Sequence, residues 1–506
     1  MKSSDNRITQ FVVVGGGTAG WIAAATLGNV FKDTDVSIEV VESPEVGIIG
    51  VGEATLPHFL TAIRNLGIDE VDFIRQTQST FKWGIEFADW AEKGQSYFHS
   101  FGKIGRQIDG HDFYQLWLKA RSEGDSVSLM EHSPEGILAG QNRFFLPHKA
   151  AQTPLAAVGY ALHLDSTLVG QYLSRYAQSA GVKRTEAHVE SVEQDAEGNI
   201  TTLKLKGGES VSGDFFIDCT GFKGLLIEQT LKAGYEDWSH FLPCNRAVTV
   251  PSAKAEHTAP YTLATAREAG WTWRIPLQHR TGNGYVYCSD YISDDEAANT
   301  LLNALDTKPL GEPKVIPFLT GVRRKIWHKN CLALGLAQGF LEPLESTAIH
   351  LVSRSVAMFI RHFPDRGIHS TLVDEFNRRM HGEYAEIRDF LVMHYCTTKR
   401  NDTPFWQFCQ NMPQSEDLQR KLAVFKASGT VVPGVEVLFE AVNWQMVLTG
   451  MGVVPERYNP TVDALDYAAL RASMAAGKAA IEKIAATQPT HDEFIERFCK
   501  APAVTM

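Results

Sequence analysis

A glycine-rich segment near the start of the chain has the spacing of a dinucleotide-binding turn. Its glycines match GxGxxG: Gly15 makes the tight turn, Gly17 lets the backbone approach a pyrophosphate, and Gly20 permits close packing of helix on strand. The helix that follows presents free N–H groups to the phosphates. Glu42, 22 residues after Gly20, stands where an acidic side chain contacts a ribose hydroxyl. The cofactor contacts predicted from this unit are Gly15, Gly17, Thr18, Ala19, Gly20 and Glu42.

The segment after a later buried strand favours FAD as the dinucleotide. Phe215-Phe216-Ile217 is followed by Asp218 and a Thr-Gly turn. This arrangement resembles the segment that flavoproteins of the aromatic-hydroxylase type close over their cofactor, and it makes Asp218 a predicted contact. Gly450-Met451-Gly452 follows a helical stretch and lacks a third glycine, so no second, nicotinamide-binding pattern is present. Reduced flavin would then have to come from elsewhere.

Four further side chains could take part in chemistry beside a flavin. Lys82 lies between two aromatic residues; a lysine is usually solvated, but burial would lower its pKa and leave a neutral or weakly held amine. Trp271 and Trp273 share one face of a strand because the side-chain period is two, although such a pair more often belongs to a core. Glu345 precedes a helical pattern, where a carboxylate commonly interacts with the helix dipole.

Hydrophobic patterns indicate the elements that must position these residues. A βαβ unit opens the chain, with a strand over 11–14, an alanine-rich helix over 21–30 and a strand over 36–41. Residues 69–152 are rich in aromatic residues and loops. Further elements are predicted at 164–180 as a helix and at 189–192, 202–205, 215–217 and 331–336 as strands.

The second half of the chain changes class. Residues 245–292 predict antiparallel strands with Gly282-Asn283-Gly284 as a hairpin turn, and helical spacing dominates beyond Ser346, including residues 467–486. We therefore expect an α/β fold. Residues 1–350 would form a Rossmann-type FAD-binding box, like that of aromatic hydroxylases, with an additional antiparallel sheet. Residues 351–506 would form a mainly helical substrate cap, packed closely without a flexible linker.

Composition excludes several classes of protein. The 506 residues carry a formal net charge of −11 without a basic patch, which disfavours nucleic acid as a partner. Seven cysteines without a CxxC pair are typical of a reduced compartment. Residues 11–31 are uncharged but interrupted by glycines, so no membrane span or signal peptide is predicted and we expect a cytoplasmic protein. HExxH, GxSxG and di-iron patterns are missing, so no metal site is expected.

Several segments together resemble the flavin-dependent halogenases of the tryptophan and indole type. They are W-x-W-x-I-P in Gly270–Pro276, a flavin-contacting strap at residues 50–55, a lysine segment at 80–84, P-L-E-S-T within 341–347 and D-T-P-F-W at 402–406. They occur in the order that the family shows. The resemblance implies further flavin contacts at Gly50, Val51, Gly52, Glu53, Ala54, Gly335 and Leu344.

The resemblance implies a two-component enzyme. A separate flavin reductase would supply FADH2, and oxygen with bromide or chloride would give hypohalous acid. Lys82 would hold the electrophilic halogen, through a hydrogen bond or as a haloamine, and Glu345 would orient the hypohalous acid and accept the ring proton. Backbone N–H groups of Thr347 and Ala348 would bind halide, although the family usually has glycine where this chain has Ala348. A homodimer is compatible with the sequence.

The substrate segment departs from the family. Tryptophan-specific members carry a Tyr-Tyr pair and then a glutamate that grip the amino-acid backbone, whereas residues 427–438 contain no tyrosine and only Glu436 as an acid. The residues that resemble the ring-holding part are His99, Phe101, Trp271, Trp273 and Phe439. An ammonium and a carboxylate would lose hydration without defined partners, so we expect indole or a larger indole-bearing molecule rather than free tryptophan.

Two alternatives share the cofactor motifs. An FAD-dependent aromatic monooxygenase would hydroxylate its substrate, and Lys82, Glu345 and the tryptophan pair would then have no role. A non-catalytic flavin carrier or reductase-docking subunit would leave the substrate unchanged. The mass of the product formed in the presence of bromide separates the three.

Overall fold

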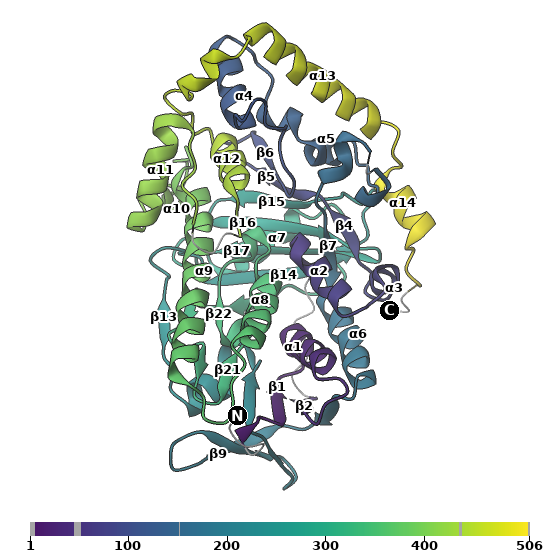
Figure 1. The fold of residues 1–506 in the computed structure, drawn as a ribbon, viewed down its shortest axis with the longest axis vertical. Coiled ribbons are helices and arrows are strands. Elements are labelled where there is room, and N and C mark those ends of the chain that lie inside the picture. The colour runs from purple at the N-terminus through teal and green to yellow at the C-terminus, as the bar shows by residue number, and fades with distance from the viewer. Residues whose placement is uncertain (1–5, 45–51, 151, 435–437, 504–506) are drawn as a thin grey trace.

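A six-stranded and a seven-stranded sheet form the frame of the protein. The computed structural model describes residues 6–44, 52–150, 152–434 and 438–503, and all statements on structure refer to these ranges. The six-stranded sheet occupies the lower part of Figure 1 and the seven-stranded sheet the middle. Helices flank the lower sheet and cover the upper end.

The six-stranded sheet contains the predicted βαβ unit. Its order is β20-β21-β12-β1-β2-β8, parallel throughout except for the edge pair of β20 with β21. The strands are β1 (Gln10–Val14), β2 (Ser37–Glu42), β8 (Lys183–Glu186), β12 (Phe215–Asp218), β20 (Trp327–His328) and β21 (Cys331–Ala333). Four consecutive buried residues in β1 match a strand covered on both faces. Helix α1 (Thr18–Val30) packs against α6 (Ser166–Ser179) and α8 (Ala348–Arg361).

The seven-stranded sheet is antiparallel except where β15 runs parallel to β5. Its order is β18-β14-β17-β16-β15-β5-β6. The strands are β5 (Gly84–Ala88), β6 (Ser96–Ser100), β14 (Arg246–Ala253), β15 (Thr262–Arg267), β16 (Gly270–Pro276), β17 (Arg280–Tyr287) and β18 (Lys314–Pro317). This confirms the predicted antiparallel sheet, and it places the W-x-W-x-I-P segment on β16 between two neighbours.

The predicted hairpin turn at Gly282-Asn283-Gly284 is wrong. These residues lie inside β17, and the turn that joins β16 to β17 is closed by the N–H of Leu277 donating to the carbonyl oxygen of Arg280. These glycines instead allow neighbouring residues to pack directly against the backbone of β17. A Cβ on Gly284 would collide with the ring of Trp273, and one on Gly282 would come within 2.9 Å of the Gly52 backbone.

Small sheets and short connections complete the body. Their strands are β3 (Gly52–Ala54), β4 (Thr80–Lys82), β7 (Ala161–Asp165), β9 (Val189–Gln194), β10 (Ile200–Leu205), β11 (Ser210–Ser212), β13 (Tyr235–Asp237), β19 (Gly321–Arg323) and β22 (Gly339–Phe340). The order β3-β7-β4 brings the predicted flavin strap beside the lysine segment. The start of the predicted helix over 164–180 belongs to β7, because Asp165 caps α6 by accepting hydrogen bonds from Thr167 and Leu168.

The remaining helices gather beside and above the sheets. They are α2 (Pro57–Asn65), α3 (Glu70–Gln76), α4 (Phe113–Ser122), α5 (Pro134–Gly140), α7 (Asp294–Asn303), α9 (Ser370–Cys396), α10 (Pro404–Gln410), α11 (Glu416–Ser428), α12 (Ala441–Gly450), α13 (Tyr467–Ala485) and α14 (His491–Phe498). In Figure 1, α9 runs along one side of the molecule, and α4 and α5 lie at the upper end with α12 and α13. Two distant parts of the chain thus share this upper layer.

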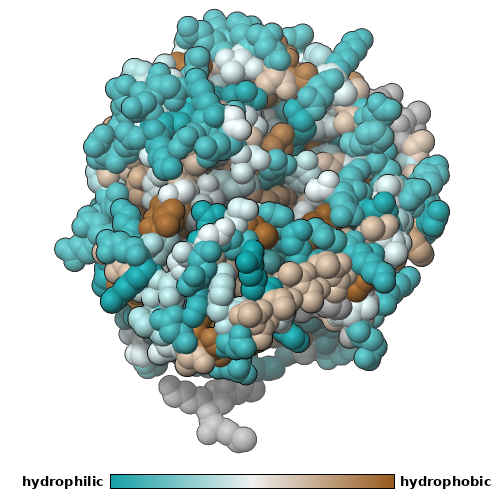
Figure 2. Space-filling view, turned by 90° about the horizontal axis from the view of Figure 1, so that it is seen from above, coloured by the Kyte–Doolittle hydropathy of each residue, from teal (hydrophilic) through white to brown (hydrophobic). Residues whose placement is uncertain are grey.

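The outer surface of the upper layer is mainly polar. Figure 2 looks down on this end and shows mostly hydrophilic residues, with apolar ones scattered among them. No helix in the described ranges combines the length and the apolar character needed to cross a membrane.

Candidate active site

A cavity of about 600 Å³ opens at the carboxyl ends of β1 and β2, where open α/β sheets bind their ligands. The predicted cofactor residues that line it are Gly15, Gly17, Thr18, Ala19, Glu42, Gly52, Glu53, Ala54, Gly335 and Leu344. Gly20 has the predicted packing role instead, since a Cβ there would collide with the carbonyl oxygen of Gly15. Gly50 and Val51 lie outside the described residues.

The glycines of this cavity fit a dinucleotide. Gly15 has a φ of +112°, and a Cβ on it would collide with the carbonyl oxygen of Cys219. Gly17 differs, because a Cβ there would have no atom within 4 Å. A volume of several hundred cubic ångströms and a backbone wall open at Gly17 suit a flavin dinucleotide.

Two carboxylates belong to this wall. Glu42 ends β2 and forms an ion pair with Arg184. Burial, with the neighbouring charge of Asp165, raises the pKa of Glu53 to about 7. Their contacts with FAD remain predictions.

Asp218 lies in a different place from the one predicted. Its carboxylate is fully buried and is not part of the cavity lining. One oxygen accepts hydrogen bonds from the N–H and the hydroxyl of Thr220, and the other accepts from the N–H groups of Leu226 and Ile227. Asp218 therefore holds the loop after β12, whose Cys219, Thr220 and Gly221 line the cavity.

The two tryptophans of β16 face the same cavity. Trp271, Trp273 and Ile275 all line it, which confirms that they share one face of the strand. The indole N–H of Trp271 donates to Oε2 of Glu342 at 3.0 Å, and Tyr395 donates to the same oxygen at 2.5 Å. Burial raises the pKa of Glu342 to about 7, against the lowering effect of these hydrogen bonds.

Lys82 is fully buried at the end of β4. Its Nζ donates to Oγ of Ser346 at 2.8 Å and to the carbonyl oxygen of Thr55 at 3.4 Å, and it lies 5.0 Å from the centre of the Phe101 ring. Burial lowers the pKa of Lys82 to about 7, although the charge of Glu345 opposes the shift. The structure therefore gives Lys82 a weakly basic amine, as the buried reading of the sequence predicts.

Glu345 is fully buried and lies between two histidines. Nδ1 of His99 lies 2.9 Å from one carboxylate oxygen and 3.0 Å from the other, and Nε2 of His394 lies 2.9 Å from Oε1. Burial alone would raise the pKa of Glu345, but these contacts outweigh it and lower the pKa to about 2. The carboxylate is thus held ionised beside a weakly basic amine.

The segment between Glu345 and α8 joins this cluster to the cavity. Ser346 adopts a left-handed conformation with a φ of +60°, binds Lys82 and also lines the cavity. Thr347 and Ala348, the predicted halide residues, line the cavity as α8 begins. The first N–H groups of a helix have no intrahelical partner and favour anions. Lys82 and Glu345 are not part of the lining.

The other predicted substrate residues are distributed around the cluster. Both ring nitrogens of His99 have hydrogen-bond partners. Nδ1 contacts Glu345, and Nε2 accepts a hydrogen bond from Nδ2 of Asn443 at 3.0 Å. The ring of Phe439 stacks on Phe390 with centres 3.8 Å apart. Glu436 lies outside the described residues. Contacts of His99, Phe101 and Phe439 with a substrate remain predictions.

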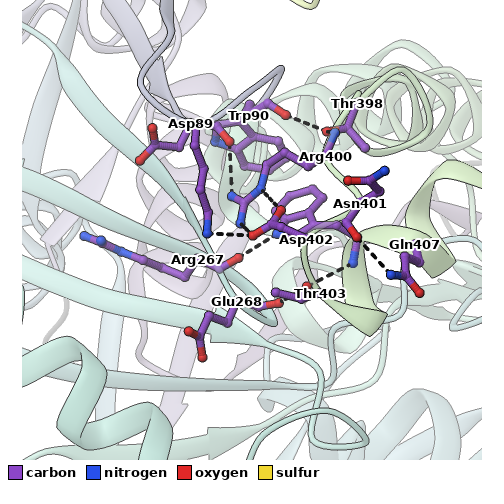
Figure 3. Close-up of polar contacts among 12 residues, drawn as sticks. Asp89, Trp90, Arg267, Glu268, Thr398, Arg400, Asn401, Asp402, Thr403 and Gln407 are labelled. Atoms are coloured by element: carbon purple, nitrogen blue, oxygen red, sulfur yellow. Dashed lines mark hydrogen bonds and ion pairs between the residues drawn. The ribbon is translucent and has the colours of Figure 1, made fainter.

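The predicted D-T-P-F-W segment and the residues before it form hydrogen bonds to the chain at the ends of β5 and β15, the two strands that follow the Trp271 strand in the order of the sheet (Figure 3). Arg400 binds Asp402 through two nitrogens and donates to the carbonyl oxygen of Asp89. Trp406 donates to the carbonyl oxygen of Arg267, at the end of β15 just before β16. The same segment therefore ties the end of β5 and the turn into β16 to the chain that follows α9.

Some residues of the site were not predicted from the sequence. Glu342 directly precedes the P-L-E-S-T segment, so its spacing of three residues from Glu345 is a signal that the sequence offers. His394 and Asn443 contribute through helices α9 and α12, and no local motif marks them. His491 anchors β4 by accepting the N–H of Phe81 at 3.2 Å, again from the distant end of the chain.

Comparisons with known proteins agree with this geometry. A family model described as tryptophan halogenase matches residues 10–467. Tryptophan 7-halogenase RebH of Lentzea aerocolonigenes is 32% identical, over 90% of this chain and 91% of that protein. Tryptophan 6-halogenase ThaL of Streptomyces albogriseolus is 33% identical, over 90% and 92%. The structure of BrvH, a flavin-dependent halogenase from Brevundimonas sp. BAL3, matches with a TM-score of 0.94 at 42% identity and covers 97% of this chain and 99% of that one.

Proposed function

The chain belongs to the tryptophan halogenase family and is a flavin-dependent halogenase, and from this premise we propose a two-component enzyme that halogenates indole or an indole-bearing molecule. FAD would occupy the cavity at β1 and β2, and a separate reductase would deliver it as FADH2. The FAD-dependent aromatic hydroxylase is the alternative that shares this cavity.

The observation that carries the proposal is the position of Lys82. This amine is fully buried, is bound to Ser346 and stands outside the cavity that Ser346, Trp271 and Trp273 line. A hydroxylase would need its substrate beside the flavin. A buried amine and carboxylate behind the cavity wall instead suit an oxidant that travels from the flavin to the substrate.

The residues of the chain would divide the chemistry as follows. Reduced FAD and oxygen supply the oxidising power that converts halide to hypohalous acid. The N–H groups of Thr347 and Ala348 bind halide at the cavity, and Trp271 with Trp273 keeps the aromatic substrate away from the flavin. Lys82 holds the hypohalous acid. The halogen of the hypohalous acid forms a bond to a ring carbon as its bond to oxygen breaks. The ring proton passes to Glu345, and the released hydroxide takes up a proton from Glu345 in turn and leaves as water.

The substrate proposal rests on the segment that would grip an amino acid. RebH and ThaL are named as tryptophan halogenases, which supports an indole ring as the common target and argues for tryptophan itself. Residues 427–438, however, contain no tyrosine and a single acid, Glu436. A free ammonium and carboxylate would be poorly compensated there, so we propose that indole or a larger indole derivative reacts faster than tryptophan.

Product mass with a flavin reductase, NADH, FAD, oxygen and bromide tests the reaction. We expect the bromine isotope pattern on indole; an added oxygen would support the hydroxylase and an unchanged substrate the flavin carrier. Equimolar indole and tryptophan in the same vessel test the substrate, and a preference for brominated tryptophan would contradict the substrate proposal alone.

A further inference from the structure

Three tryptophans and a tyrosine form a continuous line of rings that starts at the flavin cavity. Trp273 and Trp271 both line the cavity, and their ring centres lie 6.1 Å apart. The ring of Trp90 follows, 6.3 Å from that of Trp271 and 5.3 Å from that of Tyr395. Tyr395 is fully buried and is not part of the cavity lining. The line of rings therefore leads from the cavity wall into the interior behind it.

The spacing of these rings suits the transfer of single electrons. Indole and phenol rings lose an electron more readily than most other side chains, and an electron passes easily between two such rings that are packed together. Centres roughly 4.5–7 Å apart are typical of packed aromatic pairs, and each step of this line lies in that range. A flavin in the cavity is a suitable acceptor, because flavins carry out one-electron chemistry.

Tyr395 differs from the tryptophans because a base is bound to its hydroxyl group. A phenol that loses an electron becomes strongly acidic, so a buried tyrosine is a good donor only where a base takes up its proton. Oη of Tyr395 donates to Oε2 of Glu342 at 2.5 Å, the length of a charge-assisted hydrogen bond. Burial raises the pKa of Glu342 to about 7 and that of Tyr395 well above its usual value. The phenol thus keeps its proton at rest, and the carboxylate is a stronger base than an exposed one.

A second buried tyrosine nearby has no such base. Tyr285 lies on β17, the strand next to the one that carries Trp271, and it is fully buried. Its Oη accepts a hydrogen bond from the N–H of Ala269 at 3.2 Å. Within the described ranges no carboxylate accepts a hydrogen bond from it. Burial beside β16 is therefore not enough to make a tyrosine a donor, and Tyr285 is a matched control for Tyr395.

We propose that Tyr395 is the last electron donor of a path that runs along these tryptophans to FAD in the cavity. Light-excited, oxidised FAD is the oxidant. One electron passes from Trp273 to FAD, each ring behind it replaces the electron lost by the ring in front, and Tyr395 ends one electron short. Its proton moves from Oη to Oε2 of Glu342. The oxidation thus leaves the cavity wall and can be reversed when the electron and the proton return to Tyr395.

Time-resolved EPR of the full-length, FAD-loaded protein under blue light tests the path at pH 8.5, where Glu342 is ionised. We expect a tyrosyl radical, identified by a narrower signal when the protein contains ring-deuterated tyrosine. Tyr395→Phe keeps the ring but has no hydroxyl proton to release, and the signal should be lost. Tyr285→Phe should leave it unchanged. No tyrosyl radical in the wild type, or one of wild-type intensity in Tyr395→Phe, would overturn the proposal.

Glu342→Gln tests the proton acceptor. The amide oxygen still accepts the hydrogen bond but is a very weak base, so we expect a tryptophan radical in place of the tyrosyl radical. An unchanged tyrosyl signal in this variant would overturn the proton transfer to Glu342.

The wild type alone provides a check that needs no substitution. The tyrosyl radical should form more slowly in D₂O than in H₂O, because a proton moves with the electron, and equal rates would contradict the proposal. The inference uses the flavin cavity and not the halogenation step. A wild type that forms the radical but no brominated product would therefore contradict the proposed function and support the electron path.

Discussion

The wall of the flavin cavity includes a run of glycine backbone from one local motif, whereas the cluster around Lys82 consists of side chains from distant elements. At the cavity, Gly15 and Gly17 allow a ligand or a neighbouring loop to approach the chain. In the cluster, strands β4 and β6 and helix α9 contribute Lys82, His99 and His394, which meet around Glu345. The shape of the cavity at these glycines depends on the absence of side chains. The cluster depends on the contacts that Glu345 makes with His99 and His394.

This difference predicts opposite failures on substitution. A change in the cavity should act through shape, on the affinity for flavin or on the stability of the fold. A change in the cluster should act through charge and proton position, on the halogenation step, while flavin binding persists. Ser346 belongs to both regions, because it binds Lys82 and lines the cavity. Substitutions of other residues should therefore affect only one of the two regions.

Replacing Lys82 gives the largest expected effect. Lys82→Ala removes the amine that would hold the halogen, and we expect halogenation to fall by about 10³-fold or more. FAD should still bind, because Lys82 is not part of the cavity lining. Brominated product and flavin affinity are measured on the same preparation.

Lys93→Ala is the matched control for this variant. Lys93 is exposed and pairs with Asp402 at the surface, so its loss should leave both readings unchanged. Near wild-type halogenation by Lys82→Ala would remove the distinction between cavity and cluster.

Glu345→Gln should have the next largest effect. The amide keeps the size of the side chain but cannot accept the ring proton as a base, so we expect the rate to fall about a hundredfold. Rapid-quench measurement of product formed in a single turnover isolates this step. An unchanged rate in that measurement would limit Glu345 to a structural role between its histidines.

The two regions also differ in how far they follow from sequence. Gly15, Gly17 and Trp271 lie in local motifs, since a turn or a strand fixes each within a few residues, and all three line the cavity. His394 has no such marker, because its role depends on α9 passing beside Glu345. The predicted hairpin turn at Gly282 was wrong for a related reason. Glycine is typical both of turns and of close contacts between backbones, and here Gly282 lies against the backbone of Gly52, which the local sequence does not show.

Gly17→Val tests the cavity with a smaller effect. The backbone at Gly17 has a φ of −75°, which valine adopts, and the added side chain would enter open space. We expect flavin affinity to fall about tenfold to a hundredfold with little change in melting temperature, from the usual cost of overfilling a site. Equilibrium titration with FAD and thermal unfolding without it measure the two quantities.

Gly15→Ala sharpens that result. Its φ of +112° and the collision with Cys219 should cost roughly 2 kcal/mol or more of stability even without flavin. If both glycine variants lost the same amount of stability, Gly17 would be needed for the stability of the fold and not specifically for flavin binding.

The pH dependence of stability tests the cluster alone. The pKa of Lys82 is about 7 in the folded protein and 10.5 for an ordinary lysine. Between these values the unfolded chain binds more protons, so the stability of the wild type should rise with pH relative to Lys82→Met, by up to about 1.4 kcal/mol per pH unit. Groups that do not interact with Lys82 titrate alike in both proteins and cancel in the difference. Urea unfolding at pH 7.5, 8.5 and 9.5 measures it, and parallel stability curves would show that Lys82 keeps its ordinary pKa.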